Sequence, residues 1–132
     1  MYGRSLGTTV ATWLAARRPV AGLVLESPLT NAGEMSRQQY GLFPRFILRL
    51  RLDNLGTIAE VRAPVLVFHG TTDRLVPFAM AERVAAAARP PAELVPIPGA
   101  GHNETYEVGG ETYRDKLWDF VRRVTTPTVK SP

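Results

Sequence analysis

The run Gly3-Arg4-Ser5-Leu6-Gly7 constrains the fold of this chain more than any other sequence feature. A Gly-x-Ser-x-Gly run, with a glycine two residues before and after the serine, is typical of a sharp turn between a strand and a helix. Such a turn holds the serine hydroxyl clear of the sheet. Only Met1 and Tyr2 stand before it here. The sequence therefore predicts a strand-to-helix turn at its very start, with little of the strand that leads into it.

Apolar runs alternate with helical patterns along the rest of the sequence. We expect strands over residues 20–25, 65–68 and 93–97, and helices over residues 6–17, 77–89 and 112–124. Strands that alternate with helices imply a parallel sheet with right-handed crossovers. The predicted fold class is therefore α/β, with a parallel sheet of about three strands and flanking helices.

Two further residues continue the chemistry that the serine suggests. Asp73 and His102 each follow an apolar, β-branched run, where a loop at the C-terminal edge of the sheet would present them. A histidine can take the proton of a serine hydroxyl, and a carboxylate can fix the tautomer of that histidine. The chain order Ser5, Asp73, His102 is the order of one known catalytic triad arrangement. These three residues are our candidate catalytic residues.

Four segments carry a resemblance to a known family. They are Tyr-Gly-Arg-Ser-Leu-Gly-Thr (2–8), Leu-Glu-Ser-Pro (25–28), Pro-Val-Leu-Val-Phe-His-Gly-Thr-Thr-Asp-Arg-Leu-Val-Pro (64–77) and Gly-Ala-Gly-His-Asn-Glu (99–104). Together they resemble the α/β-hydrolase superfamily, and most of all its serine aminopeptidase/monoglyceride-lipase-like branch. The resemblance starts at the nucleophile elbow and implies the C-terminal half of that fold, a truncated α/β-hydrolase. It implies a partial hydrolase domain over 1–124, a lid-like or connecting segment at about 30–60, and a flexible tail over 125–132.

The resemblance also implies a reaction. A serine hydrolase of this kind cleaves an ester, thioester or amide bond through an acyl-enzyme, without a cofactor or a metal. Ser5 would be the nucleophile, His102 the base and Asp73 the residue that orients it, while the backbone N–H of Leu6 would donate to the oxyanion. The second oxyanion donor normally comes from a loop before the elbow, so we expect weak activity. The expected substrate is a small ester, an amide or a lipid-like molecule.

Other interpretations of these residues stay open. Ser5 could mark an ordinary tight turn, and Asp73 could cap the helix near residue 77 or form an Asx turn. Glu26 is the second candidate for the acid, because some hydrolases place the acid after the preceding strand. His69 precedes Asp73 in the chain and is more simply explained as structural. An alternative function is therefore a catalytically inactive, truncated hydrolase that acts as an interaction or structural module.

Residues 40–52 form an amphipathic pattern. Its apolar side holds Phe43, Phe46, Ile47 and Leu50, whereas Arg45 and Arg49 lie elsewhere on the helix. The pattern fits a helix that packs on the core, a lid over the substrate, or a membrane-surface binder. Liposome co-sedimentation without binding to anionic vesicles would remove the membrane interpretation.

Composition narrows the remaining functions. The 132 residues contain no cysteine, which excludes disulfides and thiolate metal sites, and two distant histidines make a zinc site improbable. The net charge of +4 comes from scattered arginines, so we expect no nucleic-acid partner. With no apolar run near 18 residues and no signal peptide, we expect a cytoplasmic location.

A sheet of about three strands bears on whether the chain associates with other copies of itself. The strand expected at 20–25 would leave bare the edge at which the elbow strand should pair. A bare apolar edge invites pairing with another chain, so we expect self-association through it.

Overall fold

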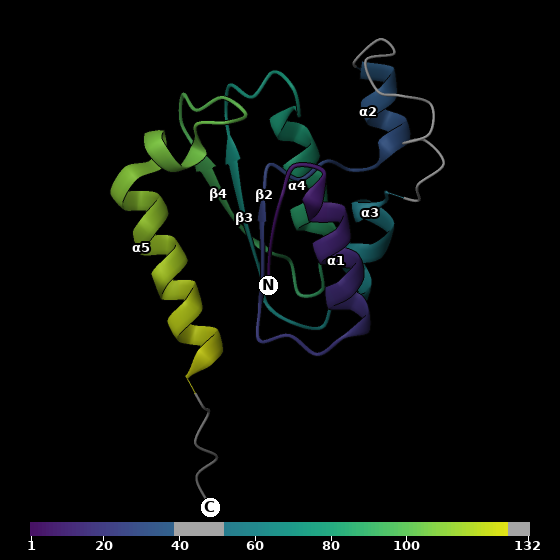
Figure 1. Cartoon of the computed structure of the whole chain (residues 1–132), viewed down its shortest axis with the longest axis vertical. Helices are drawn as coiled ribbons and strands as arrows, with labels where there is room; N and C mark the ends of the chain where they lie inside the picture. Colours follow the sequence, from purple (N-terminus) through teal and green to yellow (C-terminus); the bar gives the residue numbers. More distant parts are fainter. Residues whose placement is uncertain (39–51, 127–132) are drawn as a thin grey trace, which may run out of the picture.

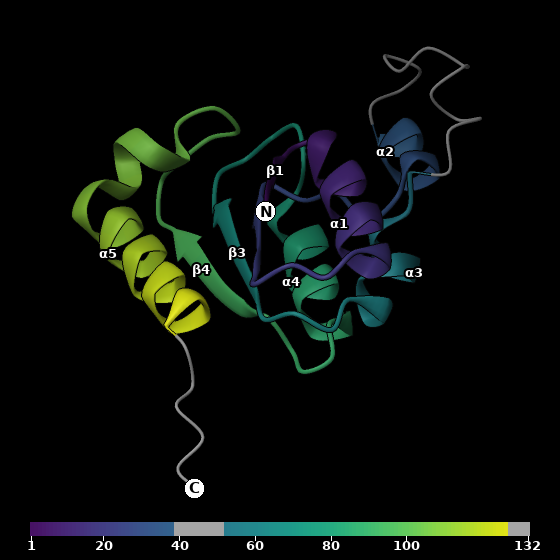
Figure 2. The same cartoon turned by 60° about the horizontal axis from the view of Figure 1, so that its bottom comes forward.

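The computed structural model describes residues 1–38 and 52–126 of the protein. Its elements are β1 (Tyr2–Arg4), α1 (Gly7–Arg17), β2 (Leu23–Glu26), α2 (Ala32–Gln38), α3 (Asn54–Thr57), the 3-10 turn η2 (Ile58–Glu60), β3 (Val65–Gly70), α4 (Phe78–Ala87), β4 (Glu93–Ile97) and α5 (Thr105–Thr125). The four strands form one parallel sheet in the order β1-β2-β3-β4. Figure 1 labels β2, β3 and β4 of this sheet, and Figure 2 labels β1. The predicted α/β class is confirmed.

The sheet has four strands, whereas the sequence predicted about three. The additional strand is β1, which pairs with β2 so that Tyr2 lies beside Val24 and Arg4 beside Glu26. Its three residues are too few to show a period, and its pairing depends on backbone hydrogen bonds that no side-chain pattern reveals. The edge of β2 that we expected to be bare is thus covered. The edge strands of the described sheet are β1 and β4, and self-association through an exposed sheet edge stays a prediction.

Helices cover both faces of the sheet (Figure 2). On one face, α1, η2 and α4 pack on Leu25 and Val67, and on the other face α5 packs on Leu66 and Phe68. Every residue of β3 is buried, as expected for a parallel strand with both faces covered. The aromatic ring of Tyr113 in α5 stacks on Phe68 with their centroids 4.0 Å apart. This packing leaves the carboxyl ends of the strands as the place where loops gather.

The last helix begins earlier than the sequence predicted. We expected it from residue 112, but α5 begins at Thr105 and passes through a kink at Gly110, where φ is +49°. The adjacent Gly109 and Gly110 disguise the first turns, because glycine disfavours a helix. The early start matters for the site, since it places Thr105 directly after the loop of His102.

The segment from 30 to 60 contains α2, α3 and η2 in its described part. Residues 40–51, on which the lid and membrane-surface interpretations rest, lie outside the described residues. In the part of the chain that is described, no helix is both long and apolar enough to cross a membrane.

Candidate active site

The turn between β1 and α1 holds Ser5 in an unusual backbone conformation. Its φ is +50°, in the left-handed region that a non-glycine residue seldom adopts. The N–H of Ser5 donates to the carbonyl oxygen of Glu26 over 2.8 Å, which ties the turn to β2. A Cβ atom at Gly3 would lie 2.7 Å from both the Ala11 Cβ and the Gly7 oxygen, so only glycine fits there. The strained serine is therefore held by its neighbours on both sides.

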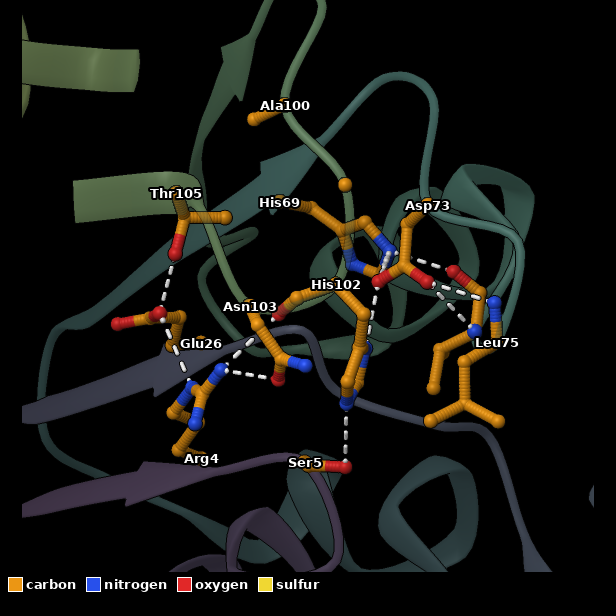
Figure 3. Close-up of polar contacts among 12 residues, drawn as sticks. Arg4, Ser5, Glu26, His69, Asp73, Leu75, Ala100, His102, Asn103 and Thr105 are labelled. Carbon is orange, nitrogen blue, oxygen red and sulfur yellow. Dashed lines mark hydrogen bonds and ion pairs between the residues drawn. The ribbon is translucent and has the colours of Figure 1, made fainter. Parts of the chain in front are cut away.

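Three side chains from three loops meet at this turn (Figure 3). The Nε2 atom of His102 lies 2.9 Å from the Ser5 Oγ, and the Nδ1 atom lies 2.7 Å from the Asp73 Oδ2. Because an ionised carboxylate can only accept, Nδ1–H of His102 donates to Asp73, and the neutral Nε2 can then accept from the Ser5 hydroxyl. The structure thus brings together the three residues that the sequence singles out, in an arrangement suited to move a proton from Ser5 to His102.

Asp73 is fixed by more than its histidine partner. Its Oδ1 accepts the backbone N–H groups of Leu75 at 2.9 Å and Val76 at 2.8 Å. Burial alone would raise the pKa of the Asp73 carboxyl, but hydrogen bonds from His102, His69 and Val76 outweigh burial and hold this pKa well below its usual range. Asp73 therefore forms the Asx-type turn and contacts His102 at the same time, with one oxygen for each task.

His69 takes a position that sequence reasoning missed. Its ring is fully buried, with Nε2 donating to the Val76 carbonyl over 2.8 Å and lying 3.3 Å from the Asp73 Oδ2. The sequence favours a structural role for this residue, and the structure adds that its ring contacts the Asp73 carboxylate, which in turn contacts His102. The only signal in the sequence is its place at a strand end, four residues before Asp73.

Glu26 does not contact the histidine ring through its carboxylate. Both ring nitrogens of His102 are occupied by Ser5 and Asp73, and Glu26 instead accepts from hydroxyl groups and pairs with Arg4. In this geometry Asp73, not Glu26, is the acid beside the histidine. Leu6 follows Ser5 at the start of α1, where backbone N–H groups lack intrahelical acceptors, so its N–H is available to an oxyanion.

We expect acid to remove a stabilising contribution at Asp73. The pKa of this carboxyl is lowered in the folded chain, whereas in the unfolded chain it is about 3.9. The contribution is thus complete above about pH 5 and is lost as the pH falls through the unfolded value toward the lower folded one. Urea unfolding of wild type and Asp73→Asn at pH 6 and pH 3 measures it. The stability difference between the two should shrink at pH 3, and an unchanged difference would contradict the expectation.

Among the described residues, no group of three or more His, Asp or Glu side chains is arranged to hold a metal ion.

Comparisons with known proteins place this geometry in context. Residues 52–131, a range that includes Asp73 and His102, match a family model described as "TAP-like protein". The chain is 42% identical over 131 residues to "Uncharacterized protein Rv2307c" of Mycobacterium tuberculosis, covering 97% of this chain and 44% of that protein. It is 33% identical over 124 residues to human "Alpha/beta hydrolase domain-containing protein 17B", covering 92% of this chain and 40% of that protein. The chain thus spans less than half the length of these relatives.

Solved structures share the fold at low sequence identity. Est1E from Butyrivibrio proteoclasticus superposes with a TM-score of 0.75 at 21% identity, covering 94% of this chain and 60% of that one. The esterase Pf2001 of Pyrococcus furiosus has a TM-score of 0.74 at 19% identity, covering 92% and 52%. At these identities the likeness concerns the fold alone.

Proposed function

This chain belongs to the α/β-hydrolase superfamily, and we propose on that premise that it carries the catalytic triad of a serine hydrolase. The hydrolase would act through an acyl-enzyme. The observation that carries the proposal is the continuous hydrogen-bonded series Ser5, His102, Asp73, with contacts of 2.9 and 2.7 Å. The finer assignment to the serine aminopeptidase/monoglyceride-lipase-like branch stays a prediction.

The geometry supports a two-stage reaction. As the Ser5 Oγ bonds to the carbonyl carbon of the substrate, His102 Nε2 takes the hydroxyl proton. His102 then gives that proton to the departing alcohol, thiol or amine when the bond to the leaving group breaks. A water molecule, deprotonated by the same nitrogen, releases the acid and restores Ser5. Throughout, the ionised Asp73 stabilises the imidazolium and keeps the proton on Nδ1.

The charge that develops on the substrate oxygen needs donors. The N–H of Leu6 follows the nucleophile at the positive end of the α1 dipole, a position that favours an oxyanion. Removal of one such donor costs roughly 10²–10³ in turnover in a comparable enzyme. A site in which Leu6 is the sole donor would therefore be slow on unactivated substrates, so activated esters are the first substrates to test.

An ester is the substrate class that we propose first. Solved structures with the same fold include two that are named esterases and an acylaminoacyl peptidase, so the choice of an ester rests on the chemistry of the leaving group. An ester needs less help with its leaving group than an amide does. Acyl chain length is set by loops and pockets, and we leave it to a screen of p-nitrophenyl esters from acetate to octanoate.

Covalent labelling tests the proposal directly. A fluorophosphonate probe should label the purified chain at Ser5, as read by mass spectrometry of the tryptic peptide. Ser5→Ala and His102→Ala should both lose the label, because the first lacks the nucleophile and the second lacks its base. Circular dichroism of each variant controls for folding. Absence of labelling on the folded wild-type chain would favour the inactive, interaction-module alternative.

A further inference from the structure

Glu26 is a buried carboxylate for which the proposed reaction has no use. It ends β2, and its side chain is 6% exposed. Its Oε2 accepts from the hydroxyl groups of Tyr2 and Tyr113, each over 2.8 Å, and its Oε1 accepts from the hydroxyl of Thr105. Burial and the neighbouring Glu26 raise the pKa of both phenols, so they remain protonated donors. The carboxylate is thus held in one position by three hydroxyl groups.

Arg4 links this carboxylate to the histidine loop (Figure 3). Its Nε lies 3.3 Å from the Glu26 Oε1, while its Nη2 donates to the His102 carbonyl at 3.1 Å and the Asn103 Oδ1 at 2.8 Å. Arg4 also directly precedes Ser5 in the chain. One guanidinium therefore connects the strand before the nucleophile to the backbone of the base.

Glu26 holds the same two segments by separate contacts. Its backbone oxygen accepts the N–H of Ser5 at 2.8 Å, and its carboxylate accepts from Thr105, which begins α5 three residues after His102. The segments carrying nucleophile and base are 97 residues apart in sequence, so their separation depends on such long-range contacts. Glu26 and Arg4 provide them on the side of the site opposite to Asp73, as drawn in Figure 3.

We propose that Arg4 and Glu26 are positioning residues that hold the His102 loop in place over Ser5. The inference rests on the proposed hydrolase function for its kinetic consequence, but the geometry it describes does not depend on turnover. Arginine suits the task because its planar, forked guanidinium reaches several acceptors at once. A lysine ammonium would carry the charge without that reach. Glu26, the second candidate for the catalytic acid, thereby receives a different role.

Substitution of Arg4 tests the kinetic part. Because 40% of its side chain is exposed, Arg4→Met should fold. We expect kcat for a p-nitrophenyl ester to fall about 10- to 100-fold with KM little changed, since a displacement of about 1 Å can cost that much. Arg4→Lys should recover part of the loss. The matched control is Arg83→Met, which breaks an ion pair with Glu34 on α2 and should leave kcat unchanged.

Coupling between residues tests whether Arg4 acts through the loop. Asn103→Ala removes one acceptor of the guanidinium and should lower kcat less than Arg4→Met does. In the Arg4→Met background, Asn103→Ala should have no further effect, because the contact it removes is already lost. Fully additive effects would overturn a shared role in holding the loop. The cycle needs no substitution at the buried Glu26, where a change would also disturb the hydroxyl groups of Tyr2, Tyr113 and Thr105.

A spectroscopic measurement separates this inference from the proposed function. The proton of His102 Nδ1–H, shared with Asp73, should give a far-downfield NMR resonance that weakens in Arg4→Met and persists in Arg83→Met. A persistent resonance with wild-type kcat, or a fall in kcat with the resonance unchanged, would overturn positioning through His102. Ser5→Ala tests the proposed function by itself, because wild-type turnover in this variant would contradict that function. Even in that case, an NMR resonance lost in Arg4→Met and kept in Arg83→Met would still support the positioning role.

Discussion

Asp73→Asn is expected to lower kcat for an ester by about 10⁴-fold, the loss found for the equivalent substitution in another serine hydrolase. The carboxylate and the amide have nearly the same shape, so the loss would come from the exchange of one acceptor for a donor. The folded chain should survive the change, although its stability near neutral pH should fall.

The orientation of the new amide follows from contacts on both sides of Asp73. At the Oδ1 position, two backbone N–H groups from Leu75 and Val76 require an acceptor, so the amide oxygen must take that place. The NH2 group is then left to face His102 Nδ1, where Oδ2 stood 2.7 Å away. A donor at this point requires an unprotonated Nδ1, which places the imidazole proton on Nε2. His102 would then be unable to accept the proton of Ser5.

Steady-state kinetics with p-nitrophenyl acetate, from pH 6 to pH 9, measures the effect. Asp119→Asn is the matched control, since it makes the same chemical change at an exposed ion pair with Arg122 on α5. Activity should be partly restored at high pH if the remaining rate depends on hydroxide in place of the base. An Asp73→Asn variant that keeps a tenth or more of kcat would show that Asp73 acts only as the turn-forming residue.

The candidate catalytic residues were visible in the sequence because each stands in a local pattern. Ser5 lies between glycines, and Asp73 and His102 each follow a strand whose apolar run marks its end. Chain order then selected a serine, an aspartate and a histidine, the residue types that a triad needs. The structure brings these three side chains together, although no local pattern states the distances between them.

The residues that support the site were not predictable in this way. Arg4 contacts the loop of His102, 98 residues away in sequence, only because the parallel sheet brings the ends of β1 and β4 to the same edge. His69 and Asp73 are only four residues apart, but their contact depends on how the loop after β3 turns back on the end of that strand, which no apolar pattern indicates. The short strand β1 was missed for a related reason, since its evidence is the backbone pairing with β2.

Gly70 is another residue that supports the site without a pattern in the sequence to indicate it. Its substitution has the second large expected effect. It ends β3 three residues before Asp73, and a Cβ atom there would lie 2.2 Å from the Ala100 oxygen and 2.9 Å from the Gly101 oxygen. Real Cβ atoms do not approach backbone oxygens this closely, so the histidine loop would have to move. Gly70→Ala is therefore expected to destabilise the fold and displace His102 together.

The loop has little freedom to move without breaking hydrogen bonds. The Ala100 carbonyl accepts both the N–H of Thr72, at 3.1 Å, and the Thr72 hydroxyl, at 2.9 Å, while Ala100 itself is fully buried. Overpacking a well-packed interior costs typically about 1–3 kcal/mol and occasionally more, and here the clash is with backbone. We expect a loss near the upper end of that range, with kcat reduced by about 100-fold because His102 lies two residues from Ala100.

Urea unfolding followed by tryptophan fluorescence, together with ester hydrolysis, measures both consequences of Gly70→Ala. Gly33→Ala in α2 is the control, because its Cβ would meet only the Asn31 Oδ1 at an ordinary 3.4 Å and alanine favours a helix. A Gly70→Ala chain with wild-type stability and kcat would show that the histidine loop does not lie against the end of β3. Loss of kcat with little loss of stability would instead mean that the loop moves easily, and that its position, rather than the core, is what Gly70 protects.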